Sequence, residues 1–404
     1  MISVDLSLFR GVFAVLLVLQ VTATAPNTTL FESEVAKLGY AMETHTVETE
    51  DFFLLTVFRL GGKTGINFLG KPLLLTHGLD ESADIWILNE VDKCVAFVLA
   101  NAGYDVWLLN NRGTAYSRGH KKFNVKQAEF WNFSFQEMAS FDIPATLDTI
   151  LSKSFGKKVT IIGHSQGATQ ALAALTDPQL RHLVDSKIKA VVGLSPAVDM
   201  GSPDFLRRQV FNAISLYVPL RKLLGVHYPF FSSAVNTKFK DFMRTVCQWS
   251  TKICEGIMYF PGFNPKCNDS KLLGKLLSVL PAGASFRSYS HFEQLYRFST
   301  KPSVLRKYDF GTAEENLKVY NSPVPPVYDW TLLNVPVFMH SGYDDTLTPH
   351  EGISMLVHDL RKLGKDVSAL FYKDWDHFSP IMSPDPSLML FNLLQDLQKV
   401  HRQD

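Results

Sequence analysis

The sequence predicts an α/β protein in which a mostly parallel central sheet is flanked by helices, and three observations indicate this fold. Apolar runs rich in β-branched or aromatic residues recur along the chain, amphipathic stretches separate several of them, and a glycine-flanked serine directly follows one run. Strands that alternate with helices form parallel sheets covered on both faces. Catalytic groups gather at the carboxyl ends of such strands.

The first evidence is the order of the elements. The predicted strands are 52–60, 73–76, 105–109, 159–162, 188–194, 335–340 and 367–372, and the predicted helices between them include 90–102, 135–153 and 351–363. A chain of 404 residues has room for one large domain with an insertion, or for two domains. A formal charge of +1 gives no electrostatic reason to expect nucleic acid as a partner.

The alternation lapses from about Met200 to Trp330, and strand-like runs resume at Val335. We therefore expect a core of residues 30–200 and 331–404, with residues 201–330 inserted after the sixth core strand as a mainly helical cap and lid. Loops of this length are rare without a function, although a set of long structural loops is the alternative.

The N-terminus has the pattern of a secretory signal peptide. Arg10 precedes the apolar run 12–19, and small residues follow, so residues 1–23 are expected to be removed after Ala23. The run is short for a bilayer span, which disfavours a stable transmembrane anchor. The expected location is secreted or lysosomal. Three sequons agree with that route and make their asparagines glycosylation candidates: Asn27, Asn132 and Asn268.

Four cysteines allow three complete pairings in an oxidising compartment. Cys247 and Cys254 are close in one segment, which favours a bridge between them, whereas Cys94 lies on a predicted helix and is expected to be a buried thiol. No cysteine or histidine spacing is typical of a metal site. Neither a metal nor a cofactor is expected.

Ser165 is the candidate nucleophile. The strand 159–162 leads into Gly163-His164-Ser165-Gln166-Gly167, and small helix-compatible residues follow. A strand, a sharp turn and a helix in this order expose a serine next to the free N–H groups of the helix. A structural turn serine is the alternative.

His377 is the candidate base because it follows the last strand, 367–372, and so emerges at the carboxyl edge of the sheet. His340 lies inside a strand, and the side chain of His164 is expected to point away from Ser165. A surface loop histidine is the alternative interpretation of His377.

Asp345 is the candidate acid. It follows the strand 335–340 in a Gly-x-x-Asp spacing, in which Gly342 is expected to open the turn. Asp344 has nearly the same position, and Asp199 follows the preceding strand. Both remain rivals.

An oxyanion hole requires two N–H donors. The amide of Gln166 follows the nucleophile, and Leu79 lies in the loop after strand 73–76, where Gly78 allows close backbone approach. His77 either supports this loop or is a satisfied core histidine.

Nine stretches resemble the acid lipase family of α/β-hydrolases, and the resemblance runs from about Tyr40 to the end. They are 77–79 (HGL), 102–108 (AGYDVWL), 111–113 (NRG), 130–139 (FWNFSFQEMA), 142–146 (DIPAT), 163–167 (GHSQG), 281–285 (PAGAS), 308–311 (YDFG) and 325–328 (PPVY). The resemblance implies the triad Ser165, Asp345 and His377 and the oxyanion amides of Leu79 and Gln166. It also implies a lid within the cap and a triacylglycerol or sterol ester substrate.

Three departures from the family border the expected pocket and affect substrate preference. Asp80 and Glu81 stand where apolar or small residues are common in the family. Asp344 adds a second candidate carboxylate beside Asp345. After His377, residues 378–380 are Phe-Ser-Pro, where the family tends to have Leu-Asp-Phe.

The expected function is therefore a serine lipase that hydrolyses neutral lipid esters through an acyl-enzyme, with a lipid droplet or micelle interface as its partner. A general carboxylesterase or thioesterase is one alternative. A catalytically silent lipid-binding protein of the same fold is the other.

Overall fold

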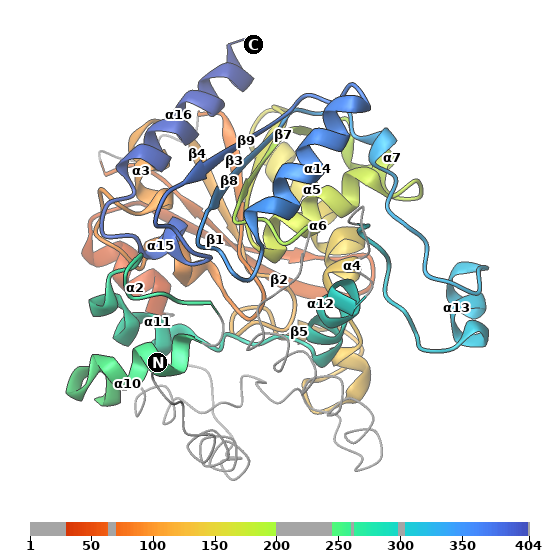
Figure 1. The fold of residues 1–404 in the computed structure, drawn as a ribbon, viewed down its shortest axis with the longest axis horizontal. Coiled ribbons are helices and arrows are strands. Elements are labelled where there is room, and N and C mark those ends of the chain that lie inside the picture. The colour runs from red at the N-terminus through yellow and green to blue at the C-terminus, as the bar shows by residue number, and fades with distance from the viewer. Residues whose placement is uncertain (1–29, 64–69, 199–244, 260–261, 298–303, 403–404) are drawn as a thin grey trace.

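The computed structural model describes residues 30–63, 70–198, 245–259, 262–297 and 304–402, and these contain a nine-stranded mixed sheet (Figure 1). Its order is β1-β2-β4-β3-β6-β7-β8-β9, with β5 paired to β2. The strands are β1 Met42–Glu48, β2 Phe53–Leu60, β3 Pro72–Thr76, β4 Asp105–Leu109, β5 Gly119–His120, β6 Val159–His164, β7 Ile188–Leu194, β8 Val337–Gly342 and β9 Val367–Tyr372.

The predicted mostly parallel sheet is confirmed, with an antiparallel edge. β1, β2 and β4 pair antiparallel, and every pair from β4 to β9 along the order is parallel. The sequence prediction missed β1, because this edge strand is half exposed and mostly polar. It also began β8 two residues early: Pro336 precedes the strand and has no N–H to donate.

Helices cover both faces of the sheet. The helices α4 Phe135–Glu137, α5 Ile143–Lys153, α6 Gln166–Thr176, α7 Arg181–Val184 and α14 His350–Lys362 pack on one face, and α2 Leu30–Lys37, α3 Val95–Asn101, α15 Ser379–Met382 and α16 Ser387–His401 pack on the other (Figure 1). Strand β3 shows why both faces need cover. Leu74 joins one buried cluster, whereas Leu73 and Leu75 join the other, as a period of two requires.

Two predicted helices differ from the structure. The stretch 135–153 is broken by a π-helical turn, Met138–Asp142, in which Ile143 N donates to Met138 O. Pro144 has no N–H and its ring would clash with a preceding carbonyl, which explains the wider turn. The helix predicted to begin at residue 90 begins at Val95, since Lys93 N and Cys94 N close a turn on Glu90 O.

Between β7 and β8 the described residues contain helices and loops. They are α10 Thr251–Tyr259, α11 Leu273–Val279, α12 Phe286–Arg297 and α13 Ala313–Tyr320. In Figure 1 the first three lie below the sheet and α13 stands apart at the right. The boundaries 201–330 of the cap stay a prediction, and its part 201–244 lies outside the described residues, as do the signal segment 1–23 and Asn27.

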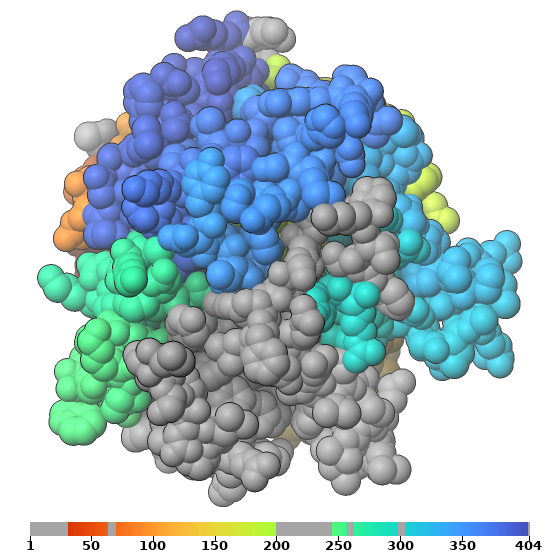
Figure 2. Space-filling model, in the orientation of Figure 1, coloured from red at the N-terminus to blue at the C-terminus, as the bar shows by residue number. Residues whose placement is uncertain are grey.

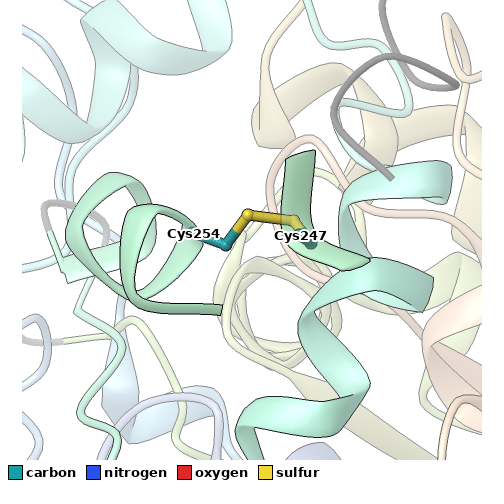
Figure 3. The surroundings of a disulfide bond; sticks show 2 residues. All are labelled: Cys247 and Cys254. Atoms are coloured by element: carbon teal, nitrogen blue, oxygen red, sulfur yellow. A yellow bond between two sulfur atoms is a disulfide. The ribbon is translucent and has the colours of Figure 1, made fainter. Parts of the chain in front are cut away.

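The predicted disulfide is confirmed: Cys247 and Cys254 are bonded and join the helical segment 245–249 to α10 (Figure 3). Cys94 and Cys267 are free and buried, and burial raises the pKa of each thiol to about 12. Cys94 precedes α3 at its N-cap. None of the helices in the described ranges combines the length and the apolar content that a bilayer crossing requires.

Candidate active site

Ser165 occupies a strained turn between β6 and α6, with φ 50° and ψ −119°. A positive φ is costly for a residue with a side chain and persists only where the surroundings enforce it. Gly163 and Gly167 make the turn possible. A Cβ at Gly163 would overlap the backbone N of Ala168, and one at Gly167 would overlap the carbonyl oxygen of Thr76. The predicted strand, turn and helix are therefore present, with the serine at the carboxyl end of β6.

The structure brings Ser165, His377 and Asp345 together. His377 Nε2 lies 2.9 Å from Ser165 Oγ, and His377 Nδ1 lies 3.0 Å from Asp345 Oδ2. The three residues come from the end of β6 and from the loops after β9 and β8. Ser165 is 8% exposed and the other two are 3% exposed, so the group lies below the surface but the serine retains some access.

Asp345 is fixed as an ionised acceptor. Its Oδ1 accepts from Leu347 N (3.0 Å) and Thr348 N (2.8 Å), and its Oδ2 accepts from Thr348 Oγ1 (2.7 Å). Burial alone would raise the pKa of Asp345, but His377 and the Thr348 donors outweigh it and hold this pKa below its usual value. Asp344 is exposed at the same loop, and Asp199 lies outside the described residues.

Gly342 acts differently from the sequence prediction. It was expected to open the turn, yet it is the last residue of β8 and its φ is not in the left-handed region. A Cβ there would overlap the carbonyl oxygen of Trp375. The glycine is needed because the loop that carries His377 passes directly against the loop that carries Asp345.

The loop after β3 lies against the nucleophile. A Cβ at Gly78 would come within 3.1 Å of Ser165 Cβ, and the half-buried Leu79 follows it. Gln166 is the first residue of α6, so its N–H has no partner within the helix. Gln166 thus directly follows Ser165, and Leu79 directly follows the glycine that lies against Ser165.

His77 is both a loop support and a satisfied core residue. Its Nδ1 lies 2.8 Å from Gly78 O, and its Nε2 accepts from Asn111 N at 3.1 Å. Burial lowers the pKa of His77 to about 4, so the ring is neutral and Nδ1 is its donor.

A second buried pair, which sequence reasoning missed, lies behind the nucleophile. His164 Nδ1 is 2.9 Å from Glu81 Oε2, and His164 Nε2 is 3.0 Å from the backbone oxygen of His377. Both ring nitrogens of His164 therefore have partners other than Ser165 Oγ. The sequence did contain one signal of this pair, the unusual carboxylate at Glu81. However, 83 residues separate Glu81 from His164, and no local pattern joins them.

Segments of the expected cap bind the loops of the site on two sides. Near His377, Asn268 Nδ2 and Asn264 N donate to Asp376 Oδ2 at 2.6 and 2.5 Å. On the opposite loop, Tyr289 Oη and Gly283 N donate to Asp80 at 2.7 and 2.8 Å. Figure 2 shows the green surface of the α10–α11 segment adjoining the blue surface of the C-terminal segment.

The two described sequons differ in exposure. Asn132 is exposed, whereas Asn268 is 5% exposed and its Nδ2 already donates to Asp376 Oδ2 and to Asn264 O. A glycan replaces one hydrogen of that nitrogen and would therefore remove at least one of these two bonds. Among the residues that the structure describes, no cluster of three histidine, cysteine or carboxylate side chains could hold a metal ion.

Comparisons with known proteins show the family to which the chain belongs. Residues 71–382 match the family model described as the alpha/beta hydrolase fold, and residues 31–90 match a partial alpha/beta-hydrolase lipase region. Gastric triacylglycerol lipase of Rattus norvegicus is 33% identical over 376 residues, which cover 88% of this chain and 87% of that protein.

Two further proteins extend the comparison. Lipase member K of Mus musculus is 32% identical over 89% of this chain and 88% of its own length. Among solved structures, a membrane phospholipase A described as a bacterial virulence factor superposes with a TM-score of 0.50 at 15% identity, over 98% of this chain and 97% of that one. At that identity the superposition supports the fold alone.

Proposed function

Since the chain belongs to the α/β-hydrolase fold family and to its lipase branch, we propose that Ser165, His377 and Asp345 form the catalytic triad of a lipase that hydrolyses carboxylic esters of neutral lipids. One observation carries the proposal. The imidazole of His377 spans Ser165 Oγ and Asp345 Oδ2 with bonds of 2.9 and 3.0 Å. These contacts are what a serine nucleophile needs for deprotonation by an oriented base.

The reaction has two halves. His377 Nε2 takes the proton from Ser165 Oγ as the oxygen attacks the ester carbonyl, and the same nitrogen then protonates the departing alcohol. Asp345 holds the ring with a proton on Nδ1 and stabilises the imidazolium. The amides of Leu79 and Gln166 donate to the carbonyl oxygen as it becomes negative. Water then attacks the acyl-enzyme by the same route and releases the fatty acid.

The lipid substrate is supported by the relatives and by the cap. The names of two relatives describe lipases, and one names triacylglycerol as its substrate. Tyr289 and Asn268, which lie within the predicted cap, donate to Asp80 and Asp376 in the loops that carry Leu79 and His377, and these contacts support a cap near the triad. We propose triacylglycerols, sterol esters or both as substrates, taken from a droplet or micelle surface.

We also propose that the protein enters the secretory pathway. The N-terminal pattern of residues 1–23 motivates this proposal, and the disulfide between Cys247 and Cys254 supports it because such bonds persist in oxidising compartments. Mass spectrometry of the protein secreted from cultured cells tests it. A mature chain that begins near Thr24 is expected, and retention of residues 1–23 would contradict it.

The activity test compares ester classes. Triolein, cholesteryl oleate and a chain-length series of p-nitrophenyl esters are incubated with the purified protein and with Ser165→Ala. We expect release of fatty acid from at least one long-chain neutral lipid, and none above background from the variant. Hydrolysis restricted to short soluble esters would identify a general esterase, and no hydrolysis of any ester would contradict the proposal.

A further inference from the structure

Behind the nucleophile lies the buried pair of Glu81 and His164, neither of which touches the triad side chains through its own polar atoms. We propose that Glu81 is a positioning residue for ester hydrolysis, which acts through Gly78 and His164 to hold the oxyanion loop and the backbone of His377 in register. This inference rests on the proposed function, because it assigns a role within that reaction.

The first argument is the contact of Glu81 with the oxyanion loop. Gly78 N donates to Glu81 Oε2 at 2.6 Å, and Glu81 N donates back to Gly78 O at 3.3 Å. The loop from Gly78 to Glu81 is thus closed by side chain and backbone at once. Leu79, which carries one expected oxyanion donor, lies inside this closed turn.

The second argument is the contact of His164 with the base. Its Nε2 faces the backbone oxygen of His377 at 3.0 Å, while its Nδ1 faces Glu81 Oε2 at 2.9 Å. Both ring nitrogens face acceptors, and a neutral imidazole has only one N–H to donate. The doubly protonated ring satisfies both bonds, and Glu81 supplies the negative charge that compensates it.

The third argument is the burial of the pair. His164 is 0% exposed and Glu81 is 4% exposed. Burial alone would lower the pKa of His164 and raise that of Glu81. The charge and hydrogen bond of each partner outweigh burial, so the pKa of His164 is raised and that of Glu81 is lowered. The other charged or titratable groups that face the pair are His77, His377 and Asp345.

These contacts connect two separate parts of the reaction. The loop after β3 supplies an oxyanion donor, and the loop after β9 supplies the base. Glu81 and His164 form a continuous chain of hydrogen bonds from Gly78 N to His377 O. Small displacements of catalytic groups reduce turnover more than they reduce ground-state binding. Loss of the carboxylate should therefore lower kcat and leave KM nearly unchanged.

The experiment compares two alanine variants in the full chain. Glu81→Ala removes the carboxylate of the pair. Asp396→Ala is the matched control, because Asp396 is also a buried carboxylate that binds a histidine, His340 Nε2 at 3.1 Å, away from the triad. With a soluble p-nitrophenyl ester, we expect Glu81→Ala to lose about 10- to 100-fold in kcat with KM changed less than about 3-fold. Asp396→Ala should keep kcat within about 3-fold of wild type.

A conservative variant gives the second readout and decides the matter if Glu81→Ala does not fold. The amide oxygen of Glu81→Gln, in the place of Oε2, can still accept from Gly78 N, but the neutral side chain no longer compensates a doubly protonated His164. Because the bond to the oxyanion loop is kept and the bond from His164 Nε2 to His377 O is weakened, its kcat should lie between those of Glu81→Ala and wild type. Wild-type kcat should decline at alkaline pH as His164 loses its second proton, and Glu81→Gln should lack this decline.

Three results would overturn the proposal while the wild-type enzyme remains active. They are an unchanged kcat in Glu81→Ala, equal losses in Glu81→Ala and Asp396→Ala, and superimposable pH profiles for wild type and Glu81→Gln. An inactive wild-type protein that also fails to react with a fluorophosphonate would instead contradict the proposed function.

Discussion

Two histidines in the C-terminal part of the chain, His377 in the loop after β9 and His340 in β8, have the same kinds of partner and different surroundings. His377 lies between Asp345 Oδ2 and Ser165 Oγ, at 3.0 and 2.9 Å. His340 lies between Asp396 Oδ2 and the hydroxyl of Tyr372, at 3.1 and 2.7 Å. Each is therefore a buried imidazole with a carboxylate on one nitrogen and a hydroxyl on the other.

The difference lies in where the hydroxyl stands. Tyr372 is the last residue of β9, its hydroxyl also accepts from Asn392 Nδ2 at 3.2 Å, and burial raises its pKa to about 12. Ser165 stands in a strained turn beside Gly78 and at the first turn of α6. We therefore propose that a hydrogen-bonded histidine and carboxylate are insufficient for catalysis without a hydroxyl in such a turn. We expect only the group with Ser165 to be reactive, because its hydroxyl lies in the strained turn beside the first N–H groups of α6.

The largest expected change in kcat comes from removing the hydroxyl that bonds each histidine. Ser165→Ala should lower kcat by about 10⁶-fold, because nothing else can form the acyl-enzyme. Tyr372→Phe, which removes the corresponding hydroxyl from His340, should change kcat less than about 3-fold. Initial rates on one soluble ester measure both. A large loss in Tyr372→Phe without unfolding would show that the comparison is wrong.

The second largest effect is expected when the carboxylate that binds each histidine is replaced by an amide. Asp345→Asn should lower kcat by about 10⁴-fold, since the amide no longer selects the ring tautomer with a proton on Nδ1. Asp396→Asn makes the same change at His340 and should alter stability but not kcat. Circular dichroism checks that both variants are folded, and ester hydrolysis gives the rates. Equal rates in the two variants would contradict the assignment of Asp345.

Replacing the glycine at the end of β8 should have a smaller effect, and it should lower the free energy of unfolding. Gly342→Ala places a Cβ against the carbonyl oxygen of Trp375 and should lower the free energy of unfolding by about 3 kcal/mol. Gly256→Ala in α10 is the control, because an added Cβ meets nothing within 4 Å. Urea denaturation measures both. An unchanged midpoint for Gly342→Ala would mean that the two loops can separate freely.

The smallest expected effect is on the pH dependence of stability, and it concerns the buried pair of Glu81 and His164. The lowered pKa of Glu81 contributes stability that is present above its ordinary 4.5 and is lost as pH falls through the folded value. The raised pKa of His164 contributes stability that is present below its ordinary 6.5 and is lost as pH rises through the folded value.

Wild type should therefore exceed Glu81→Gln in unfolding free energy mainly between pH 4.5 and 6.5, by about 1 to 2 kcal/mol. Denaturation across a pH series measures the difference. A difference that is constant from acid to alkaline pH would mean that the pair is not charged.

The sequence predicted the parts of the site that local chemistry determines. The spacing of glycines around Ser165 requires a sharp turn, and the positions of Asp345 and His377 after strands place them at one edge of a parallel sheet. Seven of the strands were recognised because they are rich in apolar and aromatic residues. The polar edge strand β1 lacked that signal.

The remaining features depend on contacts between distant segments. Gly342 is explained only by the passage of Trp375, and His164 only by Glu81 and the carbonyl of His377. The burial of Asn268 follows from its bond to Asp376, which a sequon cannot reveal. Long-range packing of this kind leaves no periodic pattern in a single sequence.

The most direct test of the triad is to map the covalent adduct. The protein is treated with a fluorophosphonate, digested and examined by mass spectrometry, alongside His377→Ala. A single adduct on the peptide that contains Ser165, formed much more slowly in His377→Ala, is the predicted result. An adduct on another residue, or ester hydrolysis that continues while Ser165 stays unlabelled, would contradict the account.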